Sequence, residues 1–114
     1  MTKARLIAMA AALTAFEGGV ASAFECPAHI ATAETEIDRV SFAIRDMADM
    51  LPVSALAQTK TLLDEARVLL AKAQAGHEAA AQPYDHALSI AYANSALAYA
   101  TAADKLHLQV MDPH

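Results

Sequence analysis

Thiol and imidazole side chains lie at three separate places in this sequence. Cys26 and His29 are three residues apart, so a helix through them would carry both on one face. His77 and His86 lie on either side of a stretch where we expect a turn between two helices. A thiolate combined with imidazoles suits Cu(I) or Zn(II). The pattern predicts a copper or zinc site formed by Cys26, His29, His77 and His86, if the fold brings these segments to one end of the molecule.

A second set of soft donors falls where we expect the opposite end of the molecule. It consists of Met47, Met50, His107, Met111 and His114. Thioethers together with imidazoles favour Cu(I) over harder cations. Met47, however, falls on an apolar stripe, where a methionine is more often a packing residue than a ligand. We therefore rank the group around Cys26 first.

Cys26 is the only cysteine of the chain, and the sequence leaves its role open. A disulfide within the chain would need a second cysteine. In an oxidising compartment, a single cysteine indicates a metal ligand, a disulfide between two chains or a free thiol. The cysteine is therefore compatible with a metal site and with a homodimer.

The usual sequence signatures of enzymes are absent. There is no glycine-rich phosphate loop, no G-x-S-x-G, no H-E-x-x-H and no EF-hand pattern. Residues 26–29 (CPAH) hold one cysteine where haem attachment requires two. The sequence predicts a binding protein rather than an enzyme. We expect a carrier of copper or zinc or, as the alternative, a helical interaction module that self-associates or binds an envelope protein.

Residues 1–23 have the three parts of a cleavable signal peptide in the correct order. Lys3 and Arg5 give a positive start, residues 6–16 (LIAMAAALTAF) form an apolar run, and residues 21–23 (ASA) match a cleavage site. An N-terminal core helix is the alternative, but residues 17–19 (EGG) interrupt its apolar pattern. We expect a signal peptide over 1–23, a single domain over 24–114, and a periplasmic or secreted location.

The charge of residues 24–114 narrows the range of partners. This region has six basic and twelve acidic residues, a net charge of −6 with neutral histidines. An acidic chain without a basic cluster disfavours nucleic acid and anionic lipid as partners. No second long apolar segment follows residue 16, so we expect no membrane span in the mature chain.

The same region is rich in alanine, leucine and charged helix formers. Pro52, Gly76 and Pro83 divide it into segments of similar length, about 27–51, 53–75 and 83–110. Proline is tolerated in the opening turn of a helix, and Gly76 is typical of a C-terminal cap. We therefore predict an all-α fold of three helices. Two long helices, the second continuing through residues 79–81, are the alternative.

Each expected helix has an apolar stripe that should face the core. The first, with steps of three and four residues typical of a coiled-coil seam, is Ile30, Ala33, Ile37, Val40, Ile44, Met47 and Leu51. The second is Leu56, Leu63, Ala66, Leu70 and Ala73, and the third is Leu88, Tyr92, Ser95, Tyr99, Ala102 and Leu106. Packed as a small antiparallel bundle, these helices would bring the start of the first beside the turn at residues 76–82.

Overall fold

The computed structural model describes the backbone of residues 2–111 and the side chains of residues 25–111. The predicted signal peptide (residues 1–23) and its cleavage site lie outside the described side chains, and His114 lies outside the described residues altogether. Over the described range the chain forms α1 (Thr2–Met47), a short 3-10 turn η1 (Ala48–Met50), α2 (Val53–Ala79) and α3 (Pro83–Met111). That range contains no strand, so the prediction of an all-α fold is confirmed.

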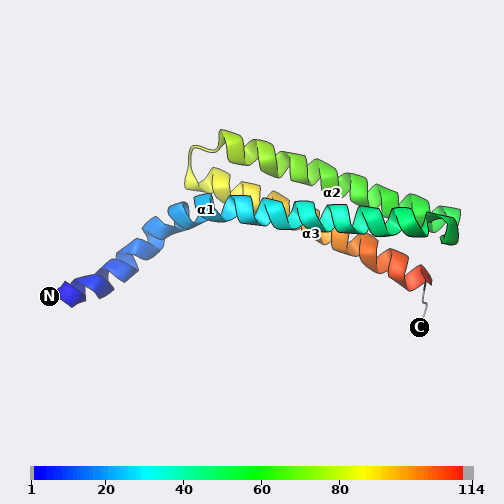
Figure 1. Cartoon of the computed structure of the whole chain (residues 1–114). Coiled ribbons are helices and arrows are strands. Elements are labelled where there is room, and N and C mark those ends of the chain that lie inside the picture. Colours follow the sequence, from blue (N-terminus) through cyan, green and yellow to red (C-terminus); the bar gives the residue numbers. More distant parts are fainter. Residues whose placement is uncertain (1, 112–114) are drawn as a thin grey trace.

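The three helices lie side by side, and consecutive helices run in opposite directions (Figure 1). A break at residues 80–82 separates α2 from α3, so the alternative of two long helices is wrong. α3 packs against both other helices, whereas α1 and α2 contact each other less. Within the range described, no helix combines the length and apolar character needed to cross a membrane.

The start of α1 differs from the prediction. We expected this helix to begin near Pro27, but it begins at Thr2 and Pro27 lies inside it. The alanine-rich residues before Pro27 have high helix propensity, so the helix continues through a position that lacks one backbone donor. The N-terminal part of α1, blue in Figure 1, extends away from α2 and α3. Among the described side chains, the packed part of α1 begins at Cys26, which is fully buried.

The predicted seam of α1 forms the core. Its buried members are Ala33, Ile37, Val40, Ile44 and Leu51. The remaining two members of the predicted stripe, Ile30 and Met47, are partly buried. The steps of three and four residues thus identified the correct face of this helix.

Gly76 is not the cap of α2, contrary to the prediction. The helix continues to Ala79 and ends at Ala80, whose backbone is extended. Gly76 is inside the helix without a positive φ, and a Cβ at this position would lie 3.7 Å from the Cβ of Ser89 on α3. The two helices approach closely here, because the Ser89 hydroxyl donates a hydrogen bond of 2.6 Å to the carbonyl oxygen of Ala73.

The buried face of α3 lies one residue further along than predicted. It consists of Ser89, Ala93, Ala96, Ala100, Ala103 and His107. The predicted stripe followed the largest side chains, but Leu88 and Tyr99 are exposed at the edges of the helix. Because α3 packs against two helices, its inward positions hold small side chains and the larger ones flank them. Alanine thus marks the buried face of this helix, and a search for large apolar residues misses it.

Arg39 connects the outer surfaces of α1 and α3. Its guanidinium donates to Glu36 on its own helix at 2.7 Å and to Asp104 on α3 at 3.0 Å. The two carboxylates raise the pKa of Arg39 above its usual range. The group stays charged in any case, and since half of this side chain is exposed, the pairs contribute little to stability.

Candidate metal site

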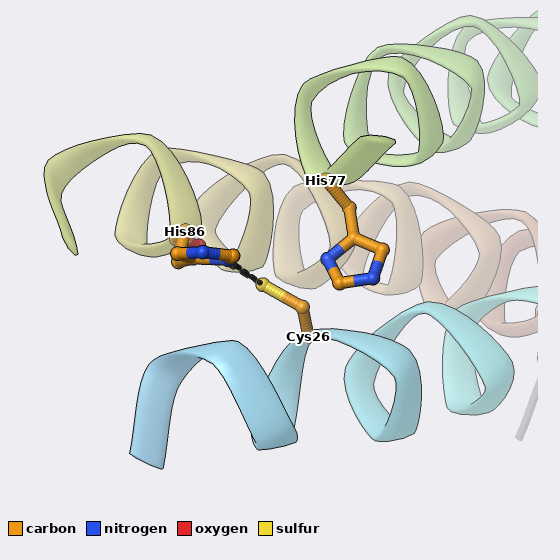
Figure 2. A group of neighbouring side chains, drawn as sticks. All are labelled: Cys26, His77 and His86. Carbon is orange, nitrogen blue, oxygen red and sulfur yellow. Dashed lines mark hydrogen bonds between the residues drawn. The ribbon is translucent and has the colours of Figure 1, made fainter. Parts of the chain in front are cut away.

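Three potential metal ligands converge where the packed part of α1 meets the α2–α3 connection. Cys26 comes from α1, His77 from the last turn of α2 and His86 from the first turn of α3 (Figure 2). One ligand atom from each, the Sγ of Cys26 and a nitrogen of each histidine, lies within 4.8 Å of the other two. Residues that are up to 60 positions apart in the sequence are thus brought into one group.

The thiol of Cys26 points at His86. Its sulfur donates a hydrogen bond to the carbonyl oxygen of His86 at 3.2 Å and lies 3.8 Å from the Nδ1 of the same residue. The side chain is fully buried, because Cys26 lies on the same seam as Ala33 and Val40. Its position on the seam therefore directs the sulfur into the interface between the helices.

His77 lies on α2, beside the thiol of Cys26. Its ring centroid is 5.9 Å from that of His86, with 61° between the ring planes. The Nδ1 of His77 is buried and has no hydrogen-bond partner among the described residues. A buried nitrogen without a partner costs about 1–3 kcal/mol. A metal ion bound at this nitrogen would remove that cost.

The short connection between α2 and α3 holds the two histidines close together. The Asp85 carboxylate accepts hydrogen bonds from the backbone N–H groups of Ala81 and Gln82, both at 3.1 Å. Asp85 thereby stabilises the turn that separates the two histidines.

His29, the fourth predicted ligand, does not join the group. Its Nδ1 lies 3.1 Å from the Oδ1 of Asn94 on α3, and its Nε2 lies 3.9 Å from Glu25. Two residues spaced three apart on a helix lie on the same broad face, but their side chains point in directions that differ by about 60°. Cys26 points into the seam, whereas His29 lies at the outer edge of the contact between α1 and α3. The spacing of three residues therefore does not bring His29 into the group.

The soft donors at the opposite end have different surroundings. Met50 is 63% exposed, whereas Met111 packs against the core. His107 is buried, with its Nδ1 3.1 Å from the carbonyl oxygen of Asp104 in its own helix. In the portion of the chain whose side chains the structure describes, Cys26, His77 and His86 are the one group of three or more thiol, imidazole or carboxylate side chains close enough to share a metal ion.

The separation of the donor atoms is close to the one that a shared metal ion requires. A metal about 2.3 Å from a sulfur and about 2.0 Å from a nitrogen, with about 120° between the bonds, holds the two atoms about 3.7 Å apart. The observed distance between the Cys26 sulfur and the His86 Nδ1 is 3.8 Å. Bringing a nitrogen of His77 from 4.8 Å or less to the same separation needs a side-chain movement of at most about 1 Å.

The chain matches no protein-family model, no curated protein and no solved structure.

Proposed function

We propose that this protein is exported and binds copper, with Cys26, His77 and His86 as the ligands. The observation that carries the proposal is the convergence of one thiol and two imidazoles from three different helices, with their ligand atoms within 4.8 Å of one another. The unpaired Nδ1 of His77 supports it, because a bound cation would satisfy that nitrogen.

Copper is favoured over zinc by the number and kind of ligands. Zn(II) is nearly always four-coordinate, so a site of three ligands leaves one position to water. Cu(I) is soft, prefers thiolate and accepts a trigonal arrangement. The distance of 3.8 Å between sulfur and nitrogen is compatible with either ion, so the softness of the thiolate carries the preference for copper. The proposed role is therefore storage or transfer of Cu(I), and zinc is the competing ion that the experiment must include.

Export is supported by the signal-peptide pattern and by the position of Pro27. Cleavage after Ala23 would make Pro27 the fourth residue of the mature chain, inside the first turn of the shortened helix. A missing backbone N–H costs nothing in that turn, because the first four donors of a helix have no partner within it. The cleaved chain would keep every described buried residue, since these begin at Cys26.

The alternative function is a helical interaction module. Its support is the outer surface of α3, where Ala87, Ala91, Ala98 and Ala102 are exposed and would let another helix approach closely. A disulfide-linked dimer through Cys26 is the less favoured form of this alternative, because the thiol is fully buried. Non-covalent association through α3 is the form to test, by light scattering over a range of protein concentrations.

The test is an anaerobic titration of the purified, exported protein with Cu(I) in competition with a chromophoric chelator. Its N-terminus is first determined by mass spectrometry, with Phe24 expected. We expect one Cu(I) per chain, and loss of competition in Cys26→Ser. His29→Gln is the matched control, since it removes an imidazole near the site that is bound to Asn94. Equal affinity in wild type and Cys26→Ser, or tight binding of zinc alone, would overturn the copper proposal.

A further inference from the structure

The donor set of the proposed site has a consequence beyond binding Cu(I). A thiolate with two imidazoles is the trigonal ligand set of copper centres that carry single electrons. Resting on the proposed function, we infer that this site holds copper in both oxidation states and exchanges one electron with an outer-sphere one-electron carrier. Oxidation converts Cu(I) to Cu(II) and passes one electron to the carrier, and reduction reverses this. The thiolate and both imidazoles stay bound throughout.

The thiolate of Cys26 is protected from the reaction that usually destroys Cu(II)–thiolate complexes. Two thiolates reduce two Cu(II) ions and join as a disulfide, so the reaction needs two thiols in contact. This chain has one cysteine, and its side chain is fully buried. Neither a second thiol of the same chain nor the thiol of another chain reaches the sulfur. A Cu(II)–thiolate complex formed here therefore persists.

The ligands are held on three helices that limit their movement. Cys26 lies on the buried seam of α1, and His77 follows Gly76 where α2 approaches α3 closely. His86 lies one helical turn before Ser89, whose hydroxyl binds the carbonyl oxygen of Ala73 at 2.6 Å. Because the helix backbones are held in this way, the ligands can rearrange only through their side chains when the charge of the metal changes. A small rearrangement favours rapid electron exchange.

The ligands differ in their exposure to solvent, and this difference provides a route for the electron. His77 and His86 are both partly exposed, whereas the Cys26 side chain is fully buried. A redox partner would approach the imidazole edges near the α2–α3 connection without reaching the thiolate. The site thus combines a shielded sulfur with a metal close to the surface, as electron exchange without ligand loss requires.

The test begins with the full exported protein loaded with Cu(I) under anaerobic conditions. It is oxidised with ferricyanide, followed by visible absorption and electron paramagnetic resonance, and then reduced with ascorbate. We expect an intense visible band from charge transfer between the thiolate and Cu(II), which disappears on reduction and returns on reoxidation. Cys26→Ser should lose the band, and His29→Gln should keep it.

The outcomes separate this inference from the proposed function. Wild-type protein that binds Cu(I) but releases copper to a chelator on oxidation, or gives Cu(II) without the band, overturns the inference and leaves the Cu(I) proposal standing. Wild-type protein that neither binds Cu(I) nor develops the band overturns both. Because the wild-type spectrum alone decides, the result does not depend on whether Cys26→Ser folds.

Discussion

The two ends of this bundle carry similar donor residues in different arrangements. At the end that contains the α2–α3 connection, a thiol and two imidazoles come from three helices and approach within 4.8 Å of one another. At the other end, Met50 points into solvent from the short turn η1, and His107 is bound to the backbone of its own helix. The comparison shows that soft donors form a group only where their positions coincide with the contacts between helices.

The reason for the difference lies in the two connections. Asp85 fixes a short turn between α2 and α3 by accepting two backbone hydrogen bonds, and a histidine lies on each side of it. At the opposite end, Leu51 is buried and closes the connection with an apolar contact. The polar turn leaves two imidazoles directed at the thiol, whereas the apolar turn directs its neighbouring methionines elsewhere.

Removing the thiol should have the largest effect on metal binding. Cys26→Ser is expected to lower the affinity for Cu(I) about 100-fold or more, which corresponds to about 3 kcal/mol. Serine keeps nearly the same shape but offers a hard oxygen donor in place of a soft sulfur. Competition with a series of chelators of graded affinity measures the change.

The matched control for this prediction lies at the other end of the bundle. Met50→Leu together with Met111→Leu removes two thioethers and should leave the affinity unchanged. If the double variant loses Cu(I) while Cys26→Ser retains it, the two ends have been assigned the wrong way round.

Bound metal should stabilise the whole bundle, because the three ligands come from three helices. At a free Cu(I) concentration 100 times the dissociation constant, we expect a gain of about 2.7 kcal/mol. For a domain of this size that gain raises the melting temperature by about 10–20 °C. Thermal unfolding followed by circular dichroism, at buffered Cu(I), measures the shift.

The stabilisation by metal can also be measured separately at each end of the bundle. Amide hydrogen exchange should slow more around His77 and His86 than around His107, because the metal first restricts local opening near its ligands. Equal slowing at both ends would mean that the ion acts through global stability alone or binds elsewhere.

A smaller effect is expected from the buried histidine at the other end. His107→Leu replaces an imidazole on the seam of α3 by an apolar side chain of similar volume, so stability should change by less than about 1.5 kcal/mol. Copper affinity should be unaffected. His86→Leu is the paired variant at the ligand end and should lose copper binding. A loss of copper binding in His107→Leu would contradict the proposed ligand set.

The sequence predicted the three helices, and it singled out three side chains that the structure brings together, Cys26, His77 and His86. Pro52 and Pro83 located the starts of α2 and α3, and the three-four spacing of Ile37, Val40 and Ile44 located the seam of α1. The sequence also placed His29 beside Cys26, and the structure does not, because a spacing of three residues does not decide which of two side chains faces a neighbouring helix. The sequence did not identify the buried face of α3, because that face is made of alanines such as Ala96 and Ala100. Their small side chains do not stand out as a periodic stripe of large apolar residues.

The smallest predicted effect concerns Gly76. Here the sequence and the structure predict opposite changes in stability when glycine is replaced by alanine. As a left-handed cap, Gly76 would lose stability when replaced by alanine. In the structure it has an ordinary helical conformation, and a Cβ would meet Ser89 at 3.7 Å, a normal contact distance. Gly76→Ala should therefore stabilise the metal-free protein by about 0.4–1 kcal/mol, through the better helix propensity of alanine.

Denaturant unfolding of the metal-free protein measures this change, with Ala75→Gly as the reciprocal control at the neighbouring exposed position. The control should lose about 1 kcal/mol, since glycine is disfavoured inside a helix. Copper affinity should change little in Gly76→Ala, because the substitution adds no donor and leaves the helix geometry at His77 intact. A destabilised Gly76→Ala variant would show that α2 ends near Gly76 in solution. The position of His77 beside Cys26, and with it the contrast between the two ends, would then be wrong.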